Sequence, residues 1–200
     1  MIAIVKTGGA NLASIQHAIQ RLGAESVATA EPSEIARAER VILPGVGAAG
    51  EAMERLKKLG LIDPIRALRQ PVLGICLGMQ ILFESSEEEN AVCLGLIPGT
   101  VTALQPGAPG SDITIPHMGW NEIGGTSFGG SKLLDGVQAD SHVYFVHSYR
   151  APLGEWVKAS VSHGQEIPTV VQKGNFFGVQ FHPEKSGRTG SQVLEAFLRV

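Results

Sequence analysis

The chain has 200 residues, of which 44% are hydrophobic and 18% are charged, so it is long enough to bury one substantial core. We expect a single domain spanning residues 1–200. The formal net charge of -3 provides no basic field that would attract a nucleic acid backbone or an anionic membrane surface, which excludes those two classes of partner.

The N-terminal residues form a short apolar run, without the basic leader, long apolar stretch and small-residue cleavage site of a signal peptide. No apolar segment approaches the roughly 20 residues that a membrane-spanning helix needs. The two cysteines, Cys76 and Cys93, have neither metal-ligand nor disulfide-framework spacing. We therefore expect a cytoplasmic protein with free thiols.

The first half of the chain alternates short apolar runs with amphipathic segments, which is typical of a parallel sheet covered by helices on both faces. Apolar residues recur at helical spacing behind Asn11, a candidate N-cap. We expect strands at residues 2–5, 26–28, 40–43 and 71–76, and helices at residues 12–22, 32–38, 51–59, 62–68 and 78–83.

Beyond residue 84, glycine, proline and short alternating segments predict antiparallel hairpins through residues 94–180. Surface loops are expected at residues 105–110 and 124–130, and a final helix at residues 190–198. The predicted fold class is α/β: three layers, with a mostly parallel central sheet, helices on both faces and added antiparallel strands.

The segment GICLG at residues 74–78 has the form of a nucleophile elbow with Cys76 at its centre, where a strand turns into a helix. Such a turn projects the thiol above the sheet, and the first amides of the helix stabilise negative charge beside it. The amide of Leu77 is then placed to receive an oxyanion. The alternative is that Cys76 is a small buried apolar residue at a strand end.

The segment GVQFHPE at residues 178–184 supplies a base. If the backbone stays extended, His182 and Glu184 point to the same side. The pair then completes a thiol, imidazole and carboxylate line, in which His182 moves the proton and Glu184 fixes the imidazole tautomer. In isolation the pair would be a loop-end histidine with a solvated carboxylate. Together with the elbow it favours a catalytic triad.

A second oxyanion donor is expected in the segment PGVG at residues 44–47, from the amide of Val46 or Gly47, although these glycines also suit a plain tight turn. Gln80 and Glu88 are candidates to hold the two polar ends of a substrate, the alternative being solvated surface. The six histidines include no HxxxH or HExxH spacing, and the glycines match no nucleotide-binding loop. We therefore expect no metal and no cofactor.

These two motifs resemble the signature blocks of the class I (triad) glutamine amidotransferases, and the likeness runs along essentially the whole chain. The segments PHMGWN at residues 116–121 and YFVHSY at residues 144–149 further resemble one branch, the glutaminase subunits of imidazole glycerol phosphate synthases. The resemblance implies a flavodoxin-like fold, a Cys76 nucleophile, a His182 base and a Glu184 orienting acid. It implies glutamine as substrate and ammonia as product.

The resemblance also implies a partner, a (β/α)8 cyclase subunit that forms a heterodimer with the glutaminase. The cyclase uses the ammonia to make imidazole glycerol phosphate and an aminoimidazole carboxamide ribonucleotide in histidine biosynthesis. The implied glutamine contacts are Gln80, Glu88, His147 and Ser148. The implied cyclase contacts are Asn11, Met118, Trp120, Tyr144 and Lys185, although core packing is an alternative for the two aromatic residues.

One departure is visible, because many relatives carry an acidic residue where this sequence has Lys6 after the first strand. Cys93 has no implied role and is expected to be structural. Two other functions share these motifs: a stand-alone γ-glutamyl hydrolase or glutaminase of another pathway, and a binding module without activity. The leading hypothesis is a glutaminase that is weakly active until its partner carries ligand.

Overall fold

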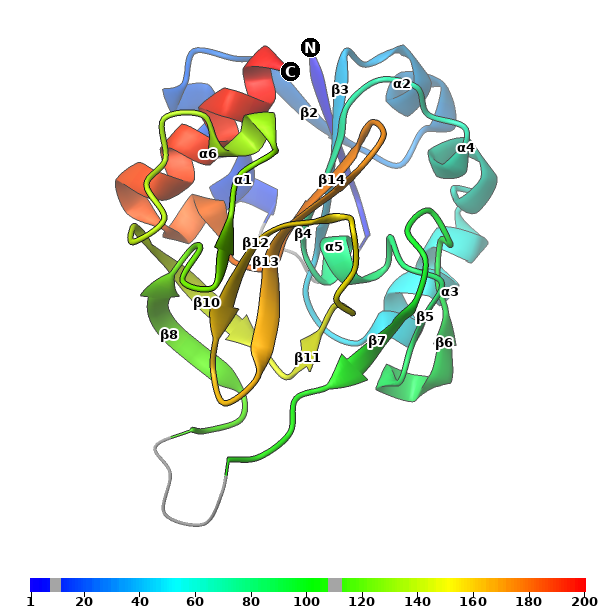
Figure 1. Ribbon diagram of the computed structural model, residues 1–200. Coiled ribbons are helices and arrows are strands. Elements are labelled where there is room, and N and C mark those ends of the chain that lie inside the picture. Colours follow the sequence, from blue (N-terminus) through cyan, green and yellow to red (C-terminus); the bar gives the residue numbers. More distant parts are fainter. Residues whose placement is uncertain (8–11, 108–112) are drawn as a thin grey trace.

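The computed structural model describes residues 1–7, 12–107 and 113–200. Figure 1 shows a central sheet with α1 and α6 on one side and α2, α3 and α4 on the other, so helices cover both faces. The helices are α1 (Leu12–Arg21), α2 (Pro32–Arg37), α3 (Ala49–Lys58), α4 (Ile62–Arg66), α5 (Leu77–Gln80) and α6 (Gly187–Arg199), with 3-10 turns η1 (Glu88–Asn90), η2 (Lys132–Leu134) and η3 (Pro183–Lys185).

The strands belong to one large central sheet and two smaller sheets. They are β1 (Ile2–Val5), β2 (Ser26–Thr29), β3 (Arg40–Gly45), β4 (Val72–Cys76), β5 (Ser85–Ser86), β6 (Ala91–Val92), β7 (Thr100–Ala103), β8 (His117–Glu122), β9 (Ser127–Phe128), β10 (His142–His147), β11 (Tyr149–Arg150), β12 (Val157–Ser162), β13 (Glu166–Lys173) and β14 (Phe176–Val179).

The central sheet has the order β2-β1-β3-β4-β14-β13-β12-β9. The pairs from β2 through β14 are parallel and those from β14 to β9 are antiparallel. The sheet is therefore mixed, as the sequence predicts. Because β3, β4 and β14 run in the same direction, their carboxyl ends meet at one edge, where α/β proteins bind their ligands.

Two hydrophobic cores lie on the two faces of this sheet, and β1 shows how one strand serves both. Ala3 and Val5 pack in the core under α2, α3 and α4, whereas Ile2 and Ile4 pack in the core under α1 and α6. All four side chains are buried. Such alternation follows from the two-residue period of a strand, and here both faces are apolar because both are covered.

The smaller sheets carry the added antiparallel strands. β8 pairs with β10, and β7 lies between β11 and β5, with β6 beyond β5. In Figure 1 the β8–β10 pair stands beside the antiparallel end of the central sheet, and β5, β6 and β7 lie near α3. β10 leads through residue 148 into β11, so one stretch of chain runs from the first small sheet to the second.

Several expected bounds differ from the structure. β3 continues through Gly45 because it pairs with β4 as far as Cys76, and β9 lies inside the expected loop at residues 124–130. α6 begins at Gly187 rather than at residue 190. The expected helix at residues 78–83 is also too long, since α5 ends at Gln80. The amides of Leu82 and Phe83 donate to carbonyls only three residues back, at Met79 and Gln80, so the α-helical bonding pattern does not continue.

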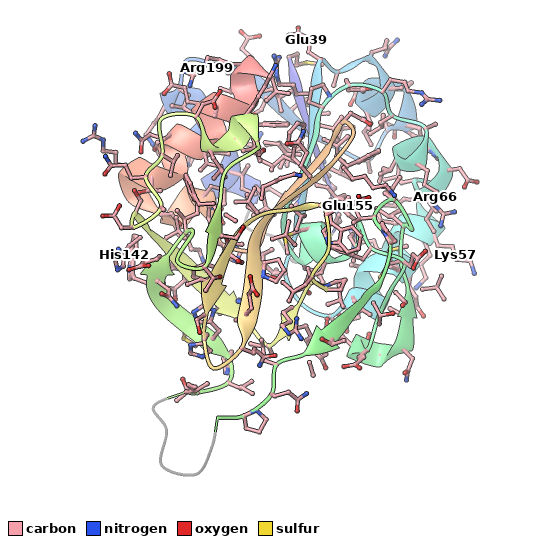
Figure 2. The ribbon with its side chains drawn as sticks, in the orientation of Figure 1. Glu39, Lys57, Arg66, His142, Glu155 and Arg199 are labelled. Carbon is pink, nitrogen blue, oxygen red and sulfur yellow. The ribbon has the colours of Figure 1, made fainter. Side chains whose placement is uncertain are left out.

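Figure 2 shows the charged side chains of Glu39, Lys57, Arg66 and Arg199 at the periphery of the fold. The described helices include none with both the length and the apolar character needed to cross a lipid bilayer.

The start of α5 packs backbone against backbone on β3 and β4, which only glycine permits. A Cβ atom at Gly78 would collide with the Leu43 carbonyl, and one at Gly74 would collide with the carbonyl of Gly78. A Cβ atom at Gly45 would lie 2.8 Å from the Gly78 nitrogen. These three glycines therefore let the chain turn sharply at Cys76.

We predict that Gly78→Ala lowers the free energy of unfolding by about 3 kcal/mol, because the new methyl group meets fixed backbone atoms. Gly60→Ala is the matched control. Gly60 has a φ of 64° and nothing within 4 Å of the added methyl, so only backbone strain of roughly 1 to 2 kcal/mol is expected. Urea titration measures both values, and equal losses would contradict the close packing described here.

Candidate active site

Cys76 stands at a strained turn between β4 and α5. Its φ of 53° and ψ of -113° lie in a region that residues other than glycine rarely occupy. Backbone strain of this kind is stored where a function needs it. The turn has the geometry of the predicted nucleophile elbow and directs the side chain to the edge where the parallel strands end.

Two polar groups contact the sulfur. The thiol of Cys76 donates to the Val146 carbonyl at 3.9 Å, and the Gln180 amide nitrogen lies 3.8 Å from Sγ and donates to it. The neutral thiol and the ionised thiolate therefore both have a partner: the thiol has a carbonyl acceptor, and the thiolate has an amide donor. Neither Gln180 nor the Val146 carbonyl was identified from the sequence.

His182 and Glu184 form the predicted pair, but by a different backbone path. Nδ1 of His182 lies 2.8 Å from Oε1 of Glu184, and each side chain is 4% exposed. The expected extended segment is wrong, because Pro183 occupies the first turn of η3. Proline has the φ that opens a helix, so the chain turns there and brings Glu184 round to the imidazole.

The electrostatics of His182 favour the imidazolium. Burial lowers the pKa of His182, but the Cys76 sulfur and then the Glu184 carboxylate outweigh it and raise the pKa to about 9. Nε2 of His182 is buried and has no hydrogen-bond partner. The sulfur is thus near enough to stabilise the charged ring without forming a full hydrogen bond to it. Such bonds often tighten only when substrate binds.

The predicted oxyanion donors lie beside the sulfur. Leu77 opens α5, and the first amide of a helix has no acceptor within that helix. Val46 and Gly47 follow β3, whose Gly45 is directly opposite Cys76 in the register. Among the described residues, no backbone hydrogen bond uses the amide of Val46 or Gly47. Gly47 has a φ of 93°, a conformation that favours glycine.

These residues line one cavity of about 430 Å³, which suits a small metabolite. The cavity brings together the elbow, the base, the oxyanion segment and all four predicted glutamine contacts. Its lining consists of Val46, Gly47, Cys76, Leu77, Gln80, Glu88, Pro116, Val146, His147, Ser148, Tyr149 and His182.

A larger hollow of about 780 Å³ lies between α3, α4 and β6, away from the elbow. It is lined by Cys93, whose pKa burial and the Glu88 carboxylate raise to about 11. A thiol with so high a pKa is a poor nucleophile at neutral pH. The smaller cavity is therefore the better candidate for chemistry, and Cys93 is suited to a structural position.

Gln80 and Glu88, two of the predicted glutamine contacts, have oxygen atoms that can accept hydrogen bonds from a ligand. Both hydrogens of Gln80 Nε2 are used, by the Tyr149 carbonyl at 2.9 Å and by Gln180 Oε1 at 3.0 Å, which leaves its Oε1 to accept from a ligand. Glu88 accepts from the Ala49 amide at 2.8 Å, and burial raises the pKa of its carboxyl. An acceptor and a carboxylate are both suited to an ammonium group.

The other two contacts follow each other in the chain. His147 is buried, and both its ring nitrogens are bound within the protein, one to His117 and one to the Tyr149 carbonyl. Its ring therefore has no polar atom left for a ligand, and any polar contact from this position must be through the backbone. Ser148 also lines the cavity.

Four of the predicted cyclase contacts gather on the outer face of the β8–β10 pair. Met118 and Trp120 are 59% and 57% exposed, so core packing is wrong for Trp120. Tyr144 lies opposite Trp120 in the register and packs edge-on against it. The Lys185 ammonium lies 5.9 Å from the centre of the Tyr144 ring. Asn11, the fifth predicted contact and a candidate cap, lies outside the described residues.

This surface is joined to the base by backbone hydrogen bonds. The His182 amide donates to the Tyr144 carbonyl at 3.0 Å, and the Tyr144 amide donates to the Ser186 hydroxyl at 2.9 Å. The Ser186 hydroxyl in turn donates to the His182 carbonyl at 2.7 Å. The strand that carries Tyr144 is thus fixed directly to the residue that carries the imidazole.

Comparison with known proteins places these features in a family context. The family model described as glutamine amidotransferase class-I matches residues 3–200. The imidazole glycerol phosphate synthase subunit HisH of Xanthomonas euvesicatoria pv. vesicatoria is 46% identical over 199 residues, covering 100% of this chain and 97% of its own length. The protein of the same name from Xylella fastidiosa (strain Temecula1) is 48% identical over the same shares.

Solved structures agree on the fold. A crystal structure of a glutamine amidotransferase has a TM-score of 0.73 at 20% identity, covering 99% of this chain and 97% of that chain. A glutamine amidotransferase from Thermotoga maritima has a TM-score of 0.63 at 18% identity, covering 99% of this chain and 82% of that one. At these identities the likeness concerns the fold alone, and it confirms the predicted fold class.

We predict that glutamine hydrolysis by this chain falls as the pH rises through about 9, where the imidazolium of His182 loses its proton. The carboxylate of Glu184 is one of the groups that raise this pKa, so Glu184→Gln should move the alkaline limb of kcat/KM to lower pH. Initial rates of glutamate formation across the pH range measure the limb. A limb that stays in place in Glu184→Gln would show that the carboxylate does not hold the proton on His182.

Proposed function

The chain belongs to the class I glutamine amidotransferase family, and we propose that it is the glutaminase subunit of an imidazole glycerol phosphate synthase. It hydrolyses glutamine to glutamate and ammonia. The ammonia passes to a (β/α)8 cyclase subunit, which forms imidazole glycerol phosphate and the aminoimidazole carboxamide ribonucleotide of histidine biosynthesis. The observation that carries this proposal is the meeting of Cys76 and His182 at one cavity, with Glu184 bonded to His182, in a chain whose full-length relatives bear that name.

In the first half of the reaction, the Cys76 thiolate attacks the carbon of the glutamine side-chain amide. The carbonyl oxygen becomes an oxyanion, which the amides of Leu77 and of the Val46–Gly47 turn stabilise. The imidazolium of His182 then donates its proton to the amide nitrogen, and the C–N bond breaks. Ammonia leaves, and a γ-glutamyl thioester remains on Cys76.

In the second half, His182 is neutral and takes a proton from water, which attacks the thioester carbon. The same amides stabilise the second oxyanion, and the C–S bond breaks to release glutamate. The sulfur leaves as a thiolate while the proton stays on His182, so the resting pair is restored. Throughout, Glu184 accepts from Nδ1 and keeps Nε2 available for proton transfer.

Glutamine is oriented by other groups that line the same cavity. We assign the α-ammonium to Glu88 and to Oε1 of Gln80, and a backbone contact to the segment of His147 and Ser148. The internal bonds of Gln80 and His147 support this division, because they leave one acceptor on the first and none on the second.

The cyclase docks on the outer face of β8 and β10. Exposed Met118 and Trp120, the partly buried Tyr144 and the cation of Lys185 give this face apolar area with a polar edge, a composition typical of interfaces. The pairing of Tyr144 with the backbone of His182 supports a direct effect of docking on the base. We place this heterodimer in the cytoplasm, where histidine biosynthesis proceeds.

We predict that Cys76→Ala in the purified complex abolishes glutamine-dependent synthesis, while added ammonium salts still support the cyclase reaction. The alanine removes only the nucleophile, and free ammonia replaces its product. Cys93→Ala is the control and should leave glutamine-dependent turnover within about twofold of the wild type. Formation of imidazole glycerol phosphate is the measurement. Full glutamine-dependent activity in Cys76→Ala would reject the proposed function.

We predict that Met118→Asp weakens binding of the cyclase at least tenfold, because the carboxylate must lose water at an apolar interface. The control is Val92→Asp, which introduces the same charge at an exposed apolar position on β6, 76% exposed. Figure 1 shows β6 and β8 on opposite sides of the fold. Titration calorimetry measures both affinities, and equal weakening would place the interface elsewhere.

A further inference from the structure

An unbroken run of hydrogen bonds leads from β8 to the Cys76 sulfur through the inside of the protein. Asn121 and His117 lie on β8, His147 ends β10, Gln80 ends α5, and Gln180 follows β14. The consecutive bonds are Asn121 Nδ2 to His117 Nε2 at 3.2 Å, His117 Nδ1 to His147 Nε2 at 3.0 Å, His147 Nδ1 to the Tyr149 carbonyl at 2.8 Å, Gln80 Nε2 to the same carbonyl at 2.9 Å, Gln80 Nε2 to Gln180 Oε1 at 3.0 Å, and Gln180 Nε2 to Cys76 Sγ at 3.8 Å.

Two backbone groups fix the direction of every bond in this line. The Tyr149 carbonyl can only accept, so Nδ1 of His147 carries a hydrogen, and the Gln80 amide presents its nitrogen. At the other end, the Glu122 amide donates to Asn121 Oδ1 at 2.8 Å, so Asn121 must present its nitrogen to His117. Nε2 of His117 therefore accepts, and its Nδ1 donates to Nε2 of His147.

Both histidines of the line are consequently neutral, each with its hydrogen on Nδ1. Their surroundings agree. Burial lowers the pKa of His117 to about 3, with His147 and His163 adding to the effect. Burial also lowers the pKa of His147 to about 4. The hydrogen bond to the Tyr149 carbonyl favours the cation and raises this pKa, but burial outweighs it. The His117 ring stacks on Phe145 and on His163, with ring centres 4.5 and 4.2 Å away.

The line ends on the nucleophile. Gln180 is fully buried and Gln80 is 4% exposed, so neither amide exchanges its partners for water. Because Gln80 donates to Oε1 of Gln180, the Gln180 amide must turn its nitrogen to the sulfur. That nitrogen is a neutral donor to a sulfur that becomes negative, and hydrogen bonds to charged groups are stronger than those between neutral groups.

The line begins directly behind the proposed docking face. On β8, Met118 and Trp120 point outward, whereas His117 is buried and Asn121 partly buried on the opposite side of the strand. The alternation of a strand thus places the proposed docking residues and the first two members of the line on opposite sides of one strand. Movement of β8 would change the first bonds of the line.

We propose that Asn121, His117, His147, Gln80 and Gln180 act as positioning residues, forming one hydrogen-bonded line of two halves, both donating to the Tyr149 carbonyl, that holds the Cys76 sulfur from β8. The Tyr149 carbonyl joins its two halves, and Gln180 makes the contact to the sulfur. The role of this hydrogen-bonded line in turnover rests on the proposed glutaminase function, whereas the geometry of the line does not. The tests therefore include readouts that need neither glutamine nor the cyclase.

The first test removes the donor to the sulfur. Gln180→Met keeps the side-chain length but has no N–H group, so alkylation of Cys76 by iodoacetamide at neutral pH should slow about tenfold. The expected loss in kcat for glutamine is also about tenfold, with KM within about twofold, because the sulfur and not the ligand loses its partner. Gln172→Met is the matched control, since Gln172 lies on β13 outside the line and should leave both rates unchanged.

The second test determines the charge and tautomer of His117 and His147, and it substitutes no residue that lines the cavity. Nitrogen-15 spectra of the wild-type chain at neutral pH should show His117 and His147 both neutral, with hydrogen on Nδ1. Asn121→Asp replaces the terminal donor by an acceptor and should move a hydrogen onto Nε2 of His117. Asn90→Asp makes the same change at an exposed residue of η1 and should leave the His117 signals in place.

Two results would overturn the proposal. One is a wild-type spectrum in which either histidine is protonated or carries its hydrogen on Nε2, because the bonds then cannot all point as described. The other is a folded Gln180→Met variant whose Cys76 is alkylated at the wild-type rate. Absence of glutaminase activity in the wild type, with both readouts as expected, would instead reject the proposed function and leave the line standing.

Discussion

The site depends on the left-handed backbone turn at Cys76, where φ is 53°. A residue other than glycine stays in that conformation only when its surroundings hold it there. Here the backbone conformation of Cys76 is maintained by close packing at Gly74 and Gly78, which let α5 lie against the backbone of β3 and β4. The same packing brings the Leu77 amide and the turn after β3 to the side of the sulfur. If the backbone at Cys76 relaxed to an ordinary conformation, the sulfur and the oxyanion donors would both move out of position.

The described histidines near the cavity illustrate how partners decide charge. His182 is buried beside a carboxylate and a sulfur, and its pKa is raised to about 9. His147 and His117 are buried too, but their hydrogen-bond partners are neutral, and their pKa values fall to about 4 and about 3. One ring is thus suited to carry a proton during catalysis, while the other two are suited to keep fixed tautomers.

The sequence predicts the parts of the site that local patterns specify. The elbow follows from two glycines around Cys76, and the α/β fold follows from alternating strands and helices. The path to Glu184 was missed because Pro183 is compatible with an extended segment as well as with the first turn of a helix. Gln180 and His117 were missed for another reason. Their roles depend on partners 104 and 30 residues away, and no local pattern encodes such contacts.

Catalysis as described here depends on the sulfur of Cys76 and the carboxylate of Glu184, which together keep His182 charged. The nitrogen-15 shifts of His182, followed against pH in the wild type and in Cys76→Ala, test it most directly. The account predicts an imidazolium at neutral pH that titrates near 9 in the wild type, and a clearly lower midpoint once the sulfur is gone. A neutral His182 at pH 7 in the wild-type protein, or a midpoint that does not move in Cys76→Ala, would contradict it.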